Sequence, residues 1–71
     1  MFKKFKRKRY KLRVTVRREK EIFAINYNYY KKINYKYDKN NGTVIAKLID
    51  SDGKKSIIEY TNVLSVEKEE M

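Results

Sequence analysis

The chain contains no cysteine, histidine, tryptophan or proline, and it has only two glycines. Without cysteine no disulfide can form, and without cysteine and histidine the common zinc sites are excluded. The same two absences remove the side chains that most often act as nucleophiles or transfer protons near neutral pH. No glycine-rich phosphate loop is present either. We therefore expect no enzymatic activity, no catalytic residue and no cofactor.

Long apolar runs are also missing. No run approaches the roughly 20 residues that a membrane-spanning helix needs, and no apolar segment of a secretory signal peptide follows the charged N-terminus. We therefore expect a cytoplasmic protein without a membrane span. At 71 residues the chain is long enough for one small domain. Apolar packing and hydrogen bonds alone must stabilise its core.

Positive charge is what the chain has in excess. The net charge is +10, and eleven of the nineteen Lys and Arg residues lie in the first twenty positions, where Glu19 is the only acid. Such a density of like charge repels itself, and a polyanionic partner is its commonest explanation. We expect DNA, RNA or an acidic protein surface as the partner. An anionic membrane surface and a simple solubility role are the alternatives.

A period of two predicts β-strands through most of the chain. Apolar and polar residues alternate from Lys11 to Arg17, and the pattern returns in residues 21–30, 33–37, 43–50 and 55–60. Turn sequences, among them Asn41-Gly42 and Ser51-Asp52-Gly53, separate these segments. Residues 63–67 read as a short closing strand, with a C-terminal helix over residues 63–70 as the alternative.

Five or six strands with hairpin-length connections predict an all-β fold. We expect a small antiparallel meander curled into an SH3-like or OB-like barrel, because an open sheet would leave one face and both edges bare. The domain then spans residues 10–67. A basic arm, disordered or helical, occupies residues 1–9, and a charged tail follows at 68–71.

The candidate nucleic-acid-binding residues are mostly cations of the N-terminal half. We expect these side chains to contact phosphates, and the arginines also to reach base edges. They are Lys3, Lys4, Lys6, Arg7, Lys8, Arg9, Lys11, Arg13, Arg17, Arg18, Lys31, Lys32 and Lys36.

A tyrosine-rich stretch over residues 27–37 has the ingredients of a base-stacking platform. The best stacking candidates are Tyr30, which the alternation places on the outward face with Asn26 and Asn28, and Tyr37 near a strand end. The alternative is structural, since tyrosine has a high strand propensity and packs well at the edge of a core.

The aspartates Asp38, Asp50 and Asp52 lie in predicted turns. Asp50-Ser51-Asp52-Gly53 resembles part of a calcium loop, but its glycine comes too early and no bidentate glutamate follows at the required position. We therefore expect no metal site.

These features together predict a small, basic, non-enzymatic protein that binds nucleic acid largely without regard to sequence. The alternative is a protein-interaction or assembly module that binds an acidic partner or associates with itself. The abundance of Lys, Asn, Ile and Tyr, which have AT-rich codons, indicates an AT-rich bacterium, a phage or a mobile element as the source.

Overall fold

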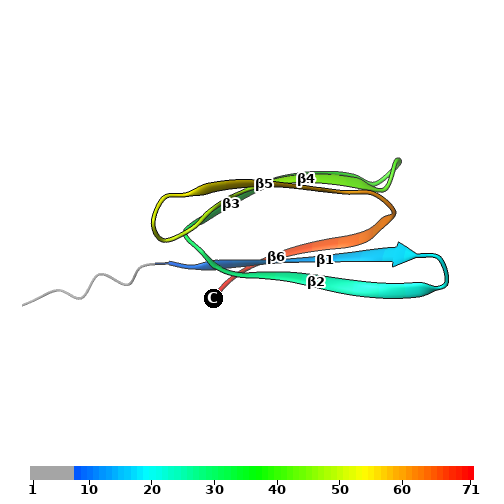
Figure 1. The fold of residues 1–71 in the computed structure, drawn as a ribbon, viewed down its shortest axis with the longest axis horizontal. Coiled ribbons are helices and arrows are strands. Elements are labelled where there is room, and N and C mark those ends of the chain that lie inside the picture. The colour runs from blue at the N-terminus through cyan, green and yellow to red at the C-terminus, as the bar shows by residue number, and fades with distance from the viewer. Residues whose placement is uncertain (1–7) are drawn as a thin grey trace, which may run out of the picture.

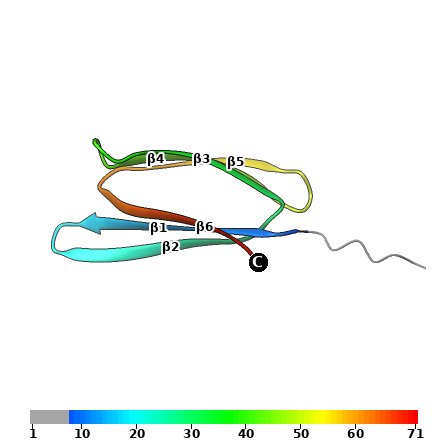
Figure 2. The same ribbon diagram turned by 180° about the vertical axis from the view of Figure 1, so that it is seen from behind.

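The computed structural model describes residues 8–71, and these residues form six β-strands and no helix (Figures 1 and 2). The strands make two three-stranded antiparallel sheets with the orders β2-β1-β6 and β3-β4-β5, which lie as two layers in Figure 1. The strands are β1 (Tyr10–Arg18), β2 (Glu21–Tyr30), β3 (Lys32–Asp38), β4 (Thr43–Ile49), β5 (Lys55–Tyr60) and β6 (Val63–Glu70).

The first sheet is built around β1, which pairs with β2 on one side and with β6 on the other. The alternation of its sequence buries Leu12, Val14 and Val16, while Arg13 lies exposed opposite Asn26 of β2 and Glu67 of β6. The β1–β2 ladder is irregular between Tyr10 and Leu12, and the β1–β6 ladder between Thr15 and Val16. Such bulges add twist and bend the strands.

The second sheet is built around β4, whose sequence alternates with the same period. Val44, Ala46 and Leu48 are buried, whereas Ile45 and Lys47 are exposed on the opposite face. The preceding turn has Gly42 at a φ of 64°. This left-handed conformation is the one that the Asn41-Gly42 pair predicts, because glycine adopts it without a steric penalty.

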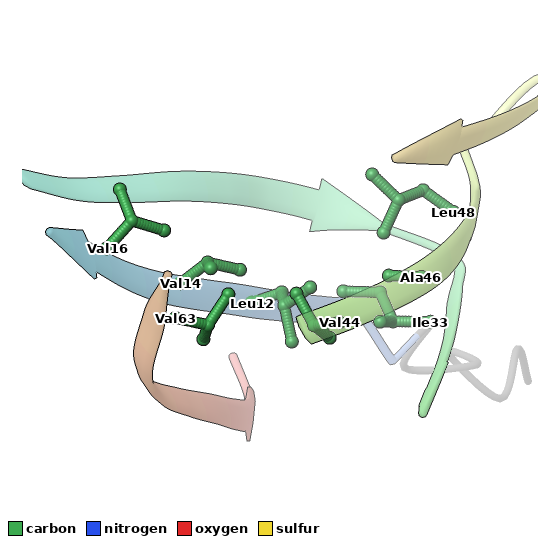
Figure 3. Close-up of a cluster of buried hydrophobic side chains, with 8 residues drawn as sticks. All are labelled: Leu12, Val14, Val16, Ile33, Val44, Ala46, Leu48 and Val63. Atoms are coloured by element: carbon green, nitrogen blue, oxygen red, sulfur yellow. The ribbon is translucent and has the colours of Figure 1, made fainter. Parts of the chain in front are cut away.

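The core lies between the two layers and consists of aliphatic side chains only (Figure 3). β1, β3, β4 and β6 all contribute to it, so neither sheet can bury its apolar face without the other. Five of the seven tyrosines surround this aliphatic centre at its rim, half-buried: Tyr10, Tyr27, Tyr30, Tyr37 and Tyr60. The buried residues are Leu12, Val14, Val16, Ile33, Val44, Ala46, Leu48 and Val63.

Polar contacts join the two layers along their sides. The hydroxyls of Tyr27 in β2 and Tyr60 in β5 form a hydrogen bond with each other. On the other side, Lys68 Nζ of β6 donates to the carbonyl oxygen of Ile33 in β3 at 2.9 Å. β5 therefore lies beside β2, and β3 lies beside β6.

The all-β class and the sixth strand are confirmed. The closing segment is a strand and not a helix, and it extends to Glu70, so residues 68–70 pair with β1 where a charged tail was expected. Closure into a single barrel is not confirmed, because the described strands form two separate ladders. Lys31 alone separates β2 from β3, and Thr61-Asn62 separates β5 from β6, so the backbone itself crosses between the layers at these points.

Candidate functional site

The outer face of β1 carries the basic residues that the sequence singled out, but β6 supplies carboxylates beside them. Lys11 Nζ lies 3.3 Å from a carboxylate oxygen of Glu69. Arg13 lies opposite Glu67 in the ladder, and its Nε donates to the side-chain oxygen of Asn26 at 3.0 Å. Glu69 forms an ion pair with Lys11, and Glu67 stands beside Arg13, so carboxylates offset part of the positive charge of both cations. Lys8 has a similar but longer contact, 3.9 Å, with Glu70.

Three of the predicted cations come together at the end of the molecule where β1 begins. Lys8 and Arg9 precede β1, and Lys31 joins β2 to β3; with Ser51 of the β4–β5 turn they line an open cleft of about 400 Å³. Two backbone hydrogen bonds hold this end together. Lys31 N donates to the Ile49 carbonyl at 2.8 Å, and Met71 N donates to the Arg9 carbonyl at 2.7 Å. Tertiary structure therefore concentrates positive charge from three separate segments.

The outer face of the second sheet carries four exposed lysines in neighbouring positions of the ladder. Lys32 of β3 and Lys55 of β5 flank Ile49 in one row. The next rows contain Lys47 beside Asn34, and then Lys36 beside Ile45. Rows on one face of a sheet repeat about every 6.8 Å. These lysines therefore form a continuous basic surface, called the lysine face below: Lys32, Lys36, Lys47 and Lys55.

Few carboxylates oppose the lysine face. Glu59 lies in the row of Lys36, on the other side of Ile45. Asp38 lies one row further, where its Oδ1 accepts the backbone N–H groups of Asn40 and Asn41 in the β3–β4 turn. The two ion pairs found within residues 8–71, Lys8–Glu70 and Lys11–Glu69, involve none of its lysines. Its positive charge is consequently less compensated than that of β1.

Two large apolar side chains lie among these lysines. Ile57 is 70% exposed and Ile45 is 50% exposed. Sequence reasoning placed Lys32 and Lys36 in the candidate site but missed Lys47 and Lys55. The alternation of the two strands could have identified them. It places Lys47 on the same face as Ile45, and Lys55 on the same face as Ile57.

Tyr30 does not lie where the alternation placed it. Tyr29 has a φ of 65°, and the register of the β1–β2 ladder shifts there. Tyr30 consequently pairs with Tyr10 and packs against the core, so it does not face outward with Asn26. A bulge reverses the faces of the residues that follow it. Tyr37 is also half-buried against the core, and its hydroxyl donates to the Val63 carbonyl at 3.4 Å.

The exposed tyrosines are others. Tyr29 is 68% exposed at the bulge, next to the cations of the β2–β3 connection, and Tyr35 of β3 is 40% exposed. Period-two reasoning could not identify Tyr29, because a bulge depends on pairing with β1 and not on local sequence.

Arg17 and Arg18 lie at the opposite end of the sandwich. Arg18 donates through Nη1 to the Thr61 carbonyl at 3.3 Å. Arg17 lines an open polar cleft of about 470 Å³ between three turns, together with Asn41 and Asn62. The predicted phosphate contacts Lys3, Lys4, Lys6 and Arg7 lie outside the described residues.

Within the part of the chain that the structure describes, Tyr27 is the group whose pKa clearly departs from its usual value. Burial raises the pKa of its hydroxyl far above the usual value, and the hydrogen bond with Tyr60 raises the pKa further. The Tyr27 side chain joins the two sheets through its hydroxyl. Because this hydroxyl stays protonated at all ordinary pH values, the contact buries no charge.

The acidic turns behave as local hydrogen-bond acceptors. Asp50 Oδ1 accepts the backbone N–H groups of Asp52 and Lys54, both at 2.9 Å. Within residues 8–71 no group of three or more Asp, Glu, His or Cys side chains is placed to hold a metal ion. The same part of the chain has no helix that could cross a lipid bilayer.

Comparison of the chain with known protein families, with curated proteins and with solved structures found no match. The function must therefore be argued from the residues and their arrangement.

Proposed function

We propose that the protein binds nucleic acid through phosphate contacts, largely without regard to sequence. The observation that carries the proposal is the lysine face, with four lysines and few carboxylates on one exposed sheet surface. Lysines spaced along such a surface can neutralise successive phosphates and release their counterions, which favours binding whatever the base sequence.

The basic end of the sandwich supports the same function. Lys31, which lines the cleft with Lys8 and Arg9, is adjacent in sequence to Lys32 of the lysine face. A nucleic-acid backbone could therefore follow one basic path from the cleft onto the sheet. Tyr29 is exposed beside this path, and a base stacked on its ring would add about 1–3 kcal/mol. Lys3, Lys4, Lys6 and Arg7 would add further phosphate contacts from the N-terminal arm.

The proposed architecture for this function is an SH3-like barrel. β2 and β3 belong to different sheets but have only Lys31 between them, so they can serve as one bent strand shared by both layers. β6 returns to β1 after the short break at Thr61-Asn62, as a closing strand does. These two features favour an SH3-like over an OB-like arrangement.

Fluorescence anisotropy of labelled single- and double-stranded oligonucleotides tests the function. We expect micromolar or tighter binding at about 50 mM salt and much weaker binding at about 200 mM, because each phosphate contact contributes about 0.9 to the logarithmic salt slope on duplex and about 0.7 on single strands. Absence of binding to either oligonucleotide at the lower salt concentration would contradict the proposal.

A matched pair of variants locates the contact. Lys36→Gln with Lys47→Gln removes two charges from the lysine face, and Lys11→Gln with Arg13→Gln removes two charges from the compensated face of β1. The first pair should lower the salt slope by about 1.4–1.8 and the second by much less. Equal effects of the two pairs would show that net charge, and not the lysine face, determines binding.

The alternative partner is an acidic protein surface. Ile45 and Ile57 favour it, because exposed apolar side chains within a charged rim are typical of protein interfaces. This alternative gains support if the oligonucleotides fail to bind at low salt.

A further inference from the structure

We propose that two copies of this chain associate edge to edge through β2, in antiparallel orientation. The association would join two β2-β1-β6 sheets into one continuous sheet of six strands. The inference is independent of nucleic-acid binding, since it concerns the backbone edge of β2 and not the lysine face.

Among the strands of residues 8–71, β2 is the least protected edge strand. Each three-stranded sheet has two edge strands, which are β2 and β6 in one sheet and β3 and β5 in the other. β3 and β5 carry charged residues along their length, and β6 ends in four consecutive charged residues, whereas β2 has ten residues and Glu21 at its start as the only charge. Charged side chains on an edge normally prevent pairing with another chain, and β2 lacks them.

Exposed apolar side chains accompany this unprotected edge. Ile22 is 58% exposed, Phe23 is 45% exposed, and Tyr29 is 68% exposed. All three belong to β2, whereas β3, β4, β5 and β6 each contribute one large exposed apolar side chain. Pairing through this edge would therefore remove apolar surface from water as well as satisfy free backbone groups.

The regular part of β2 fits a second copy of itself. It runs from the hairpin turn to the bulge, residues 22–28, and Ile25 is its centre. A two-fold axis at Ile25 would set Phe23 opposite Tyr27 and Ala24 opposite Asn26 of the other copy. Opposed residues of antiparallel strands share a face, so Phe23, Ile25 and Tyr27 of the two copies would meet on one face, while Ala24 would meet Asn26 on the other.

The charges at the ends of β2 favour the antiparallel orientation. Glu19 and Glu21 flank its start, and Lys31 and Lys32 follow its end. Arg18 and Lys20 balance these two carboxylates, so the start of β2 has no net charge. Parallel pairing would align the two Lys31-Lys32 pairs, whereas antiparallel pairing sets each pair beside a start that contains two carboxylates. Arg18, also near the start, is directed to the Thr61 carbonyl.

Sedimentation equilibrium of the full chain at about 50 and 500 mM salt tests the proposal. We expect a monomer–dimer equilibrium that strengthens with salt, because each copy carries a net charge of +10 and salt screens their repulsion. A monomer at every concentration up to about 200 μM and at both salt concentrations would overturn the proposal; that range reaches well into the affinities of weak complexes.

Two double variants test the register. Ala24→Glu with Asn26→Glu sets like charges opposite each other at two symmetric places in the dimer, and it should weaken dimerisation on the order of tenfold. Ala24→Lys with Asn26→Glu sets opposite charges there and should retain the dimer. Both variants place a carboxylate beside Arg13 at position 26, but they differ in charge at position 24, so far-UV circular dichroism must verify that each variant folds.

The outcomes separate clearly. A dimer that the Glu–Glu variant leaves intact would show that β2 is not the interface. Equal loss of dimer in both folded variants would show that positions 24 and 26 do not face each other across it. Asn34→Lys, on the edge strand β3, is the control that should leave dimerisation unchanged.

Discussion

Leu12 has no exposed surface and lies near the middle of the core (Figure 3). Truncating it to alanine removes buried methyl groups and leaves a cavity between the layers, since both sheets pack around it. We expect Leu12→Ala to lower the free energy of unfolding by about 2–5 kcal/mol, a large part of the total stability of so small a domain. Urea denaturation followed by far-UV circular dichroism measures it.

Ile57 is the matched control for Leu12. It is an aliphatic residue of similar size on the outer face of β5, where it is 70% exposed. Ile57→Ala should change the free energy of unfolding by no more than about 0.5 kcal/mol. Similar losses in the two variants would mean that the core is not centred between the layers at Leu12.

Lys68 makes specific contacts with both sheets, although its sequence context suggests a solvated charge. In the sequence it belongs to a charged C-terminal run, yet it stands opposite Leu12 in the ladder. Its ammonium group lies 5.0 Å from the centre of the Tyr10 ring and donates to the Ile33 carbonyl. Lys68 therefore reaches from the first sheet to the second, with its charged group held by the Tyr10 ring and the Ile33 carbonyl.

At the scale of elements, the β1–β2 hairpin contains a residue in an unfavourable conformation. Its two-residue turn, between Arg18 and Glu21, has a φ of 55° at Glu19 but no positive φ at Lys20. A positive φ at the first position alone is the pattern of a type II′ turn, in which glycine is preferred there. Glu19→Gly should therefore raise the free energy of unfolding by about 1 kcal/mol, because a non-glycine residue is strained in this conformation.

Thermal denaturation of three variants would test this prediction. Lys20→Gly adds the same flexibility at a position that does not need it, so it should lower the melting temperature. Glu19→Gln removes the charge alone and separates an electrostatic effect from relief of backbone strain. Destabilisation by Glu19→Gly as large as that by Lys20→Gly would show that the turn is not strained at position 19.

At the scale of the whole molecule, the Tyr27–Tyr60 hydrogen bond joins the edges of the two sheets. Tyr27→Phe removes it and should lower the free energy of unfolding by about 1 kcal/mol near neutral pH. The loss should come without a change of fold, since the ring is retained. Equilibrium denaturation of the two proteins measures the difference.

The raised pKa of Tyr27 gives this contact a pH dependence. In the unfolded chain a tyrosine loses its proton near pH 10, whereas in the fold the pKa of Tyr27 is higher because of burial and the Tyr60 hydroxyl. Its contribution to stability is therefore complete below about pH 10, and it declines as the pH rises above the unfolded pKa. Above pH 10 the stability of the native chain should fall more steeply than that of Tyr27→Phe. Parallel pH profiles would contradict this assignment.

The two proposed interactions respond to salt in opposite directions. Binding to a nucleic acid weakens as salt rises, because releasing the same counterions into a more concentrated salt solution gains less entropy. Pairing of two copies through β2 strengthens, because the repulsion between cationic copies is screened. The two proposals can therefore fail separately, and measurements at low and high salt distinguish them on the same preparation.

The sequence by itself determined the strands, their inward faces and two of their turns. Alternation is a local property of the sequence. Leu12 and Val14 of β1, and Val44 and Leu48 of β4, could therefore be assigned to the core without knowing which strands are neighbours. The Asn41-Gly42 pair likewise requires a positive φ that glycine supplies locally. Where local backbone geometry departs from regular alternation, as at Tyr29, the assignment of faces failed for Tyr30.

Tertiary structure decided which charges remain available. Nothing in the local sequence of β1 indicates that Glu67 and Glu69 of β6 will stand beside Arg13 and Lys11, because strand neighbours are set by packing between distant segments. The same long-range pairing gathers Lys32, Lys36, Lys47 and Lys55 from three strands onto one face. Charge composition therefore indicated a polyanionic partner. The pairing of the strands is the reason why we propose that this partner binds the second sheet and not β1.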